Sequence, residues 1–426
     1  MDRFNERTKV NIFKNISVYF VSQVITALLP IIIIPIVSRT LSLNDFGNYS
    51  LYKGIFGFLI PIVGLSFSSA VVRKYYMIER SIFLSYLLTL MVVVSGAGMC
   101  LWIVMLVNMD YLLKFLKTND SYIVLYSLYL AYLTSISYIL LGYYRITNDL
   151  RRYLISNIII IFLSIFGVLI LDFYHVLTLF NLMNVHLAAI SLSVIYNIID
   201  FFNRSRSKLS LDFYYLKDTF NYSLPLVLYS VLAQFYASGD RFFINYFLDK
   251  ESLAVYSAGS QMAFAIPLIG QSIQLAWTPV VFEEMTRSDS QKKLKRMIFV
   301  FWIVLIFFTI IYILVYPYIF QHFLPRKFDS VLQFFYLFII AGFFQSLYWL
   351  YNPFLLFYER NSIFVYITLI GASVSLTLNY CFAERGLFWI ASIFAFSWFV
   401  QFLSLLIAIK YVKNLKKDLQ HLSYIA

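Results

Sequence analysis

Apolar residues fill most of the chain in blocks of about 20 residues, and charged or turn-forming residues separate one block from the next. A block of that length crosses the roughly 30 Å hydrocarbon layer of a bilayer as an α-helix. The pattern predicts twelve membrane-spanning helices, at residues 16–38, 46–70, 82–107, 121–144, 153–171, 179–202, 219–246, 253–281, 297–320, 331–357, 361–382 and 387–409. We therefore expect an all-α integral membrane protein.

The composition agrees with this prediction, because 61% of the residues are hydrophobic and only 13% are charged. Soluble domains carry about 25% charged residues, and no stretch between the apolar blocks is long enough to form one. Cys100 and Cys381 lie inside apolar blocks without a metal or redox spacing, which favours a packing role. No cofactor is expected, and the first apolar block has the length of an uncleaved membrane helix.

The net charge of +12 does not indicate a nucleic-acid partner, because the basic residues lie in short loops between the apolar blocks. If the N-terminus is cytoplasmic, about 24 of the 33 Lys and Arg residues face the cytoplasm. Both termini are then cytoplasmic, and the basic loops rest against anionic membrane lipid. Two cations, Lys53 and Arg241, remain inside predicted spans.

A weak repeat relates the two halves at a spacing of about 207 residues. The segment Leu41–Ser50 aligns with Leu248–Ser257, and with one deletion Pro61–Gly64 then aligns with Pro267–Gly270. Six helices per half give both halves the same orientation, so we expect two parallel six-helix repeats with a substrate path between them. The predicted division is an N-terminal bundle at 1–203, a cytoplasmic linker at 204–217, and a C-terminal bundle with a basic cytoplasmic tail at 218–426.

Prolines gather in the first two helices of each half. Six of the nine prolines are in this group, namely Pro30, Pro35, Pro61, Pro225, Pro267 and Pro279. Proline removes a backbone donor and bends a helix, and membrane helices tolerate this where neighbours satisfy the freed carbonyl. Membrane helices are also generally richer in proline than soluble ones, but the matched placement favours a bending gate.

Polar residues of the seventh span recur at three- and four-residue steps and form one stripe, at Ser230, Gln234, Ser238, Arg241 and Asn245. An arginine facing lipid costs about 2.5–3.5 kcal/mol at the helix centre, so the stripe should face water or other helices. Asp240 lies off the stripe and is a possible ion-pair or coupling residue. A structural ion pair between Asp240 and Arg241 is the alternative.

Lys53 is the corresponding cation of the first half, about 10 Å inside the outer end of the second span. At that depth its ammonium can also snorkel to the outer interface, which is the alternative to a role in a substrate path. Glycines on the same span allow close helix approach, at Gly47, Gly54, Gly57 and Gly64. Further polar residues lie on the eighth span, at Ser257, Ser260, Gln261, Gln271 and Gln274. His186 and Asp200 lie near helix ends, which favours positions at the membrane interface.

These features resemble the Wzx-type polysaccharide flippases of the multidrug/oligosaccharidyl-lipid/polysaccharide exporter superfamily. The resemblance rests on the two six-helix halves, the basic N-terminal segment, the motif at Leu41–Ser50, the pair Asp240-Arg241, and the later Val255-Tyr256-Ser257. It covers essentially the whole chain, but its motifs are loose and hydrophobic.

The resemblance implies a bacterial inner-membrane flippase that moves an undecaprenyl-diphosphate-linked oligosaccharide, an O-antigen-type unit, to the outer leaflet by alternating access. Lys53 and Arg241 would then attract the diphosphate, with Arg39 at the outer rim and the polar residues of spans seven and eight along the path. A proton or sodium gradient is the implied driving force, and a polysaccharide polymerase is an implied partner.

Three other functions remain open. A drug/ion antiporter of the same superfamily would favour buried carboxylates, whereas the ionisable residues inside the spans are Lys53, Arg241 and Asp240. A peptidoglycan-precursor flippase tends to carry more cavity arginines and extra C-terminal helices. A membrane enzyme of polysaccharide assembly would need a large outer loop or a catalytic motif, and the sequence has neither a Gly-rich phosphate loop nor a Ser/His/Asp arrangement.

Overall fold

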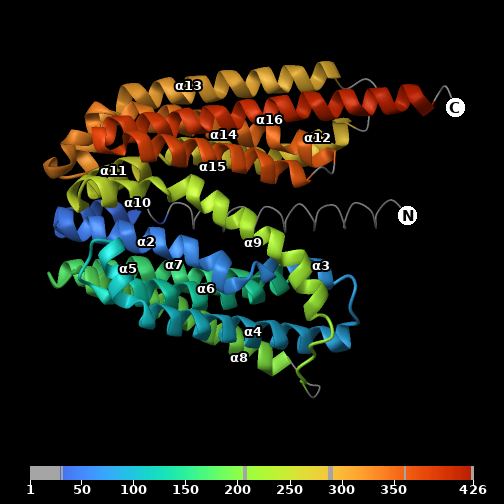
Figure 1. Cartoon of the computed structure of the whole chain (residues 1–426), viewed down its shortest axis with the longest axis horizontal. Coiled ribbons are helices and arrows are strands. Elements are labelled where there is room, and N and C mark those ends of the chain that lie inside the picture. The colour runs from blue at the N-terminus through green and yellow to red at the C-terminus, as the bar shows by residue number, and fades with distance from the viewer. Residues whose placement is uncertain (1–28, 30–31, 205–208, 286–290, 359–360, 424–426) are drawn as a thin grey trace. The chain divides into compact units, whose positions relative to one another are not determined.

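The computed structural model of the protein describes residue 29 and residues 32–204, 209–285, 291–358 and 361–423. All regular elements in this part of the chain are helices (Figure 1). They are α2 (Leu43–Gly64), α3 (Phe67–Lys74), α4 (Arg80–Val107), α5 (Met109–Phe115), α6 (Ser121–Ile146), α7 (Leu150–Phe173), α8 (Leu179–Arg204), α9 (Leu216–Ser238), α10 (Asp240–Phe247), α11 (Lys250–Met262), α12 (Ala265–Met285), α13 (Gln291–Phe323), η1 (Arg326–Gln333), α14 (Phe335–Phe357), α15 (Asn361–Phe382), η2 (Ala383–Arg385) and α16 (Leu387–Ser423). The expected all-α class is confirmed.

Within the described residues, seven helices are long and apolar enough to cross a membrane, and ten spans result if each bent helix pair counts as one. All ten correspond to predicted spans. Most of the predicted span at 16–38 lies outside the described residues. The remaining span, predicted at 219–246, is divided into α9 and α10, and its polar stripe makes it less apolar than the others.

Three predicted single spans are bent pairs of helices. The axes turn by 41° between α2 and α3, by 40° between α11 and α12, and by 63° between η1 and α14. At the first bend Leu65 and Ser66 adopt left-handed backbone angles, with φ of 50° and 51°. Such angles are unfavourable for residues with a side chain, so tertiary packing must hold this bend in place. Pro61 lies inside α2 just before the first bend, and Pro267 lies in the first turn of α12 just after the second.

The predicted repeat has structural counterparts at aligned positions. Ser42 precedes α2 and accepts a hydrogen bond from the Asp45 backbone N–H at 3.1 Å. Asp249, the residue aligned with Ser42, precedes α11 and accepts a hydrogen bond from the Ser252 backbone N–H at 2.6 Å. Both side chains cap a helix that begins at the next residue, so the repeated loop motif is a helix start signal.

The aligned glycines also occupy equivalent packing sites. A Cβ on Gly64 would lie 2.7 Å from the Ser135 hydroxyl oxygen, and a Cβ on Gly270 would lie 2.5 Å from that of Ser346. Ser135 donates to the Ile60 carbonyl at 3.3 Å, and Ser346 donates to the Ile266 carbonyl at 3.1 Å. Each half therefore has the same close helix crossing, in which glycine makes room and serine satisfies a carbonyl next to a proline.

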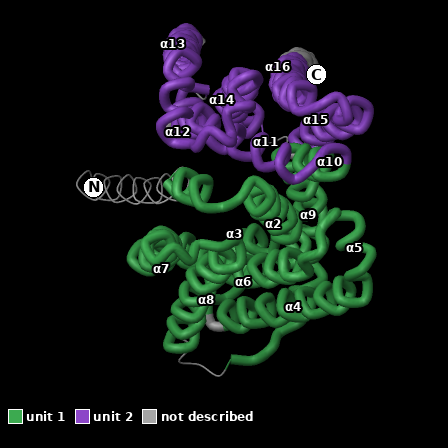
Figure 2. Tube along the Cα trace, turned by 90° about the vertical axis from the view of Figure 1, so that its left-hand side faces the viewer, with its two compact units in different colours: residues 1–246 green, residues 247–426 purple. Residues whose placement is uncertain are grey.

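By packing, the chain forms two compact units, residues 1–246 and 247–426, which are coloured separately in Figure 2. Helices α9 and α10 pack within the first unit, and α9 contacts both α2 and α3. The two compact units therefore meet in the chain at residues 246 and 247, after the linker at 204–217 that the sequence repeat predicts. The repeat divides the chain by sequence similarity, and that division stays a prediction. The compact units are defined by contacts, and α9 falls in the first unit because it packs on α2 and α3.

Helix α9 approaches α2 closely at a glycine. A Cβ on Gly57 would lie 2.2 Å from the Gln234 amide nitrogen, whereas a Cβ on Gly54 would meet Phe242 at an ordinary distance of 3.6 Å. The ring of Phe58 packs edge-on against Phe242 at 5.2 Å. The helix that carries the polar stripe is thus held against α2 by one tight contact and an aromatic cluster.

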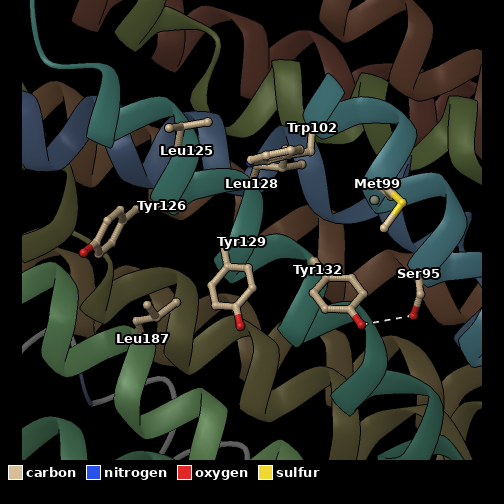
Figure 3. Close-up of a pocket in the computed structure, with 10 residues that line it drawn as sticks. Ser95, Met99, Trp102, Leu125, Tyr126, Leu128, Tyr129, Tyr132 and Leu187 are labelled. Atoms are coloured by element: carbon tan, nitrogen blue, oxygen red, sulfur yellow. Dashed lines mark hydrogen bonds between the residues drawn. The ribbon is translucent and has the colours of Figure 1, made fainter. Parts of the chain in front are cut away.

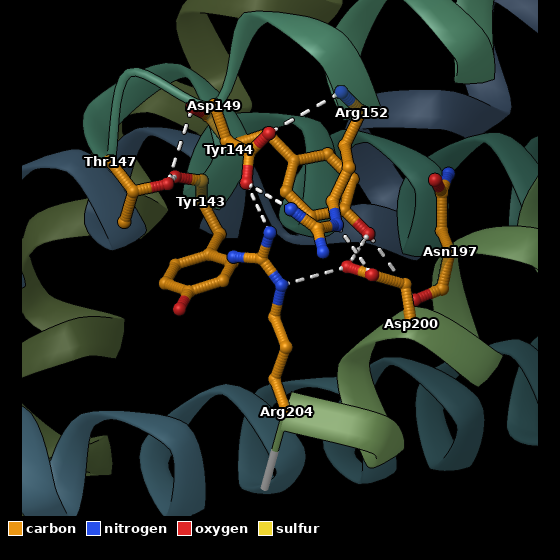
Figure 4. Close-up of polar contacts among 8 residues, drawn as sticks. All are labelled: Tyr143, Tyr144, Thr147, Asp149, Arg152, Asn197, Asp200 and Arg204. Atoms are coloured by element: carbon orange, nitrogen blue, oxygen red, sulfur yellow. Dashed lines mark hydrogen bonds and ion pairs between the residues drawn. The ribbon is translucent and has the colours of Figure 1, made fainter.

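Four charged side chains join the ends of α7 and α8 with the turn after α6 (Figure 4). Arg152 contacts Asp149 at 2.6 Å and Asp200 at 2.5 Å. Arg204 pairs with Asp149 and lies 3.1 Å from Asp200. Tyr144 donates its hydroxyl hydrogen to Asp200 at 3.0 Å. Two acids and two bases balance, so the network needs no further counter-ion.

Alanine substitutions at two glycines of α2 should have different effects on stability, because Gly57 is tightly packed and Gly54 is not. We expect Gly57→Ala to lower the apparent melting temperature of the purified protein, because the new methyl group displaces Gln234. Gly54→Ala, on the same helix, should be neutral or stabilising, since alanine favours a helix over glycine by about 1 kcal/mol. Adding Gln234→Ala to the Gly57→Ala variant should restore stability. Equal melting temperatures for the two single variants would contradict this packing argument.

Asp200→Asn should destabilise the N-terminal unit by about 1–3 kcal/mol, because it leaves two partly buried arginines with one carboxylate. Thermal unfolding in detergent, followed by near-ultraviolet circular dichroism, measures the effect. Asp172→Asn is the matched control, because Asp172 is a partly buried carboxylate of α7 outside the network. A loss of the same size in both variants would show that the network contributes nothing specific.

Candidate functional site

The polar stripe of the predicted seventh span lies on two helices, because α9 ends at Ser238 and α10 begins at Asp240. Gly239 separates them, and a Cβ there would lie 2.4 Å from the Phe235 carbonyl oxygen. Phe242 donates its N–H to the Gly239 carbonyl at 3.1 Å, which tightens the first turn of α10. Arg241 therefore projects from a short separate helix and not from the long one.

Arg241 is half-buried and lies beside the other polar residues of the stripe. Its guanidinium contacts the Ser238 hydroxyl at 3.5 Å, and Gln234 donates to the same hydroxyl at 3.1 Å. Its Nε is buried and has no hydrogen-bond partner among the described residues. A buried unpaired donor on a charged group is costly, and an acceptor brought to it would relieve that cost.

Asp240 is buried at the start of α10, and its carboxylate accepts a hydrogen bond from the Arg241 backbone N–H at 2.8 Å. Asn245, also buried, donates its amide to the Leu116 carbonyl at 2.7 Å. Lys117 donates to the Tyr246 carbonyl. Asn245 and Lys117 thus link α10 to the turn that follows α5.

Lys53 lies half-buried on α2, with its ammonium 5.5 Å from the centre of the Tyr49 ring. A Cβ on its neighbour Gly54 would lie 3.6 Å from Phe242, the residue after Arg241, so the two cations repel one another across this helix contact. His186 of α8 is buried, and its ring lies 5.8 Å from that of Tyr49. The structure thus brings together the two cations predicted from sequence and adds a histidine to them.

The sequence reading missed His186 because it lies only seven residues after the start of its helix. The spacing of polar residues could have identified it. Ser193 and Asn197 follow His186 by seven and eleven residues, so the three share one face of the helix. All three side chains are buried in the structure. The expected position of His186 at the membrane interface stays a prediction, and the structure adds that its side chain is buried within the protein.

The remaining predicted site residues have varied surroundings. Arg39 is exposed at the end of the helical residues 32–40, and Ser230 is half-buried on α9. In the C-terminal unit, Gln261 donates to the Ser257 carbonyl of its own helix at 3.0 Å. The two other predicted residues of this unit, Gln271 and Gln274, are half-buried on α12. No group of three or more potential metal ligands occurs among the described residues.

A mostly apolar pocket of about 600 Å³ lies between α4 and α6 in the N-terminal unit (Figure 3). Tyr126, Tyr129 and Tyr132 line it from α6, and the Tyr132 hydroxyl lies 3.0 Å from that of Ser95. Tyr126 donates to Asn184 at 2.9 Å, two residues before His186 on α8. The pocket therefore borders α8, the helix that carries His186.

The first turn of α9 is held on α3 and α4. Lys74 pairs with Asp218, and its hydrogen bond lowers the pKa of this carboxyl below the ordinary value. The hydroxyls of Tyr86 and Thr219 lie 3.0 Å apart. The Lys74–Asp218 ion pair and the contact of Tyr86 with Thr219 therefore anchor the first turn of α9.

The site therefore offers two half-buried cations, one with an unsatisfied donor, beside the polar side chains of Gln234, Ser238 and Asp240. Arginine and lysine bind phosphate or carboxylate oxygens through charge-assisted hydrogen bonds. Such bonds strengthen where water is excluded. The arrangement suits reversible binding of an anion.

Comparisons with known proteins agree with this fold. The model of a family described as "Polysaccharide biosynthesis protein" matches residues 12–285. An uncharacterized membrane protein of Haemophilus influenzae is 23% identical over 295 residues, which cover 67% of this chain and 68% of that protein.

Two solved structures are similar over nearly the whole chain. The lipid II flippase MurJ, in an inward closed conformation, has a TM-score of 0.67 at 14% identity, covering 94% of this chain and 87% of MurJ. A multidrug resistance MATE family transporter of the MOP superfamily, in an outward-facing conformation, has a TM-score of 0.65 at 14% identity, covering 95% and 96%. The chain is therefore a multi-pass membrane protein with the fold of the MOP superfamily, and it belongs to the polysaccharide biosynthesis protein family.

Proposed function

We propose that the protein is a Wzx-type flippase that moves an undecaprenyl-diphosphate-linked oligosaccharide from the inner to the outer leaflet of a bacterial inner membrane. The observation that carries the proposal is that Lys53 and Arg241 are half-buried cations on two helices in contact, since Gly54 of α2 faces Phe242 of α10. Two cations that repel one another are retained at a cost unless an anion joins them. A diphosphate supplies that anion.

The Arg241 Nε adds support, because it is a buried donor without a hydrogen-bond partner among the described residues. A phosphate oxygen would satisfy it through a charge-assisted bond. The sugar head group would cross along the polar residues while the lipid tail stays in the bilayer. The similarity to a lipid II flippase supports a lipid-linked substrate. The family description supports a substrate whose sugars are built into a polysaccharide.

A drug/ion antiporter is the second candidate, and the similarity to the MATE transporter favours it. A cationic drug would need carboxylates in the site. Of the charged groups near Arg241, Asp240 is a carboxylate, but it accepts a hydrogen bond from the Arg241 backbone. The excess of positive charge at Lys53 and Arg241 therefore favours an anionic head group over a cationic drug.

Alternating access with both termini in the cytoplasm completes the proposal. The bends beside Pro61 and Pro267 would serve as the gate. A proton or sodium gradient would drive the cycle, and a polysaccharide polymerase would consume the exported unit. An O-antigen-type repeat unit is the proposed substrate.

Arg241→Ala should lower export by about tenfold or more, because a hydrogen bond to a charged group contributes about 1.5–3 kcal/mol. Lys53→Ala should weaken export, whereas Lys53→Arg should largely preserve it. The measurement is the amount of lipid-linked oligosaccharide retained on the inner leaflet of a deletion strain that expresses each variant.

Lys114→Ala is the matched control, since it removes one exposed cation on α5 away from the site. All variants should reach the membrane at equal levels. Normal export by Arg241→Ala would remove Arg241 from the mechanism. If both Lys53 variants exported normally, Lys53 would be a snorkelling residue and not a substrate contact.

A further inference from the structure

His186 is a buried histidine that the proposed transport path does not use. Its side chain is 7% exposed, and its Nδ1 is buried without a hydrogen-bond partner among the described residues. Buried polar atoms are normally paired, and an unpaired one calls for a functional explanation. Histidine is also the side chain whose ordinary titration falls in the physiological pH range.

The groups around His186 come from α2, α6 and α10. From α2 come Tyr49, in ring contact at 5.8 Å, and Lys53, whose charge acts on the imidazole. Tyr126 of α6 bonds to Asn184, two residues before His186. The charged residues of α7 lie at its two ends, and its Gly167 lies opposite Val185, the residue before His186.

Two further groups of this part of the site complete the set. The ring of Tyr52, also on α2, lies 6.3 Å from that of Tyr49. Arg241 of α10 acts on Lys53. No carboxylate among the described residues forms a hydrogen bond or salt bridge with the imidazole in the structure. The fixed charges that bear on His186 are therefore positive.

These charges link proton binding to anion binding. Burial is the larger obstacle to a positive imidazolium, and repulsion by Lys53 adds to it when the site holds no anion. An anion that neutralises Lys53 and Arg241 removes the repulsion, so it favours the binding of a proton at Nδ1. By linkage, a proton on His186 must favour the anion equally.

We propose that His186 is a proton-binding site coupled to the anion site of Lys53 and Arg241, so that the protein takes up one proton as it binds a diphosphate. The proton comes from water, adds to Nδ1 without breaking another bond, and returns to water when the anion leaves. This inference rests on the proposed function, because it assumes that the anion is the head group being moved. It assigns the coupling to His186 and not to Asp240.

The test uses the purified full-length protein in nanodiscs and the water-soluble diphosphate diester UDP-glucose. Both phosphates of this probe are fully ionised from about pH 6 to pH 8, so its own titration does not contribute. One linked proton changes affinity by at most about tenfold per pH unit. We expect affinity to rise at least about threefold as the pH falls across this range, and calorimetry in buffers of different ionisation enthalpy to show proton uptake.

His186→Gln should keep binding but lose its pH dependence and its proton uptake. His175→Gln is the matched control, since His175 is an exposed histidine on a turn, and it should behave as the unaltered protein. Asp240→Asn should keep the pH dependence. If His186→Gln does not fold, the proton uptake of the unaltered protein still tests the coupling, and its absence overturns the proposal.

The outcomes separate the two proposals. Binding that Arg241→Ala abolishes, but that is independent of pH, would overturn the role of His186 and leave the anion site standing. Loss of pH dependence in Asp240→Asn and not in His186→Gln would move the proton site to Asp240. Absence of binding, or binding that Arg241→Ala leaves intact, would overturn the proposed function and this inference with it.

Discussion

The absence of water from the bilayer interior is the constraint on which the structure depends, since each polar group there must find a partner within the protein. The helix crossings meet it in the same way in both units. Ser135 and Ser346 donate to carbonyls beside prolines, and Gly64 and Gly270 provide the space. The Nε of Arg241 and the Nδ1 of His186 are two of several buried side-chain atoms that lack a hydrogen-bond partner among the described residues. What distinguishes them is their place in the candidate site and their ability to bind an anion and a proton.

Hydropathy predicted the spans well because crossing a bilayer requires a long apolar helix, whatever its neighbours are. The bends were harder to predict. Leu65 and Ser66 adopt left-handed angles although neither is glycine, so the turn has no sequence signature. The repeat was visible because the cap at Ser42 and Asp249 and the glycine at Gly64 and Gly270 each need particular residue types.

The candidate site was predicted in part. A stripe on one helix identified Arg241, Gln234 and Ser238, which do lie together in the structure. The same stripe included Asn245, whose partner is the Leu116 carbonyl on a distant segment. Periodicity shows which residues share a face of a helix, but it does not show what that face meets. For the same reason the sequence pattern placed His186 only near a helix end, since its contact with Tyr49, which also lies beside Lys53, comes from another helix.

The one-residue break at Gly239 places Arg241 on α10, whereas Gln234 and Ser238 lie on α9. The two helices are fixed by different segments of the N-terminal unit. Asn245 ties α10 to the Leu116 carbonyl in the turn after α5, whereas Lys74 and Tyr86 hold the first turn of α9. A substitution in the turn after α5 would therefore act on the helix that carries the arginine without touching the anchor of the helix that carries its polar neighbours.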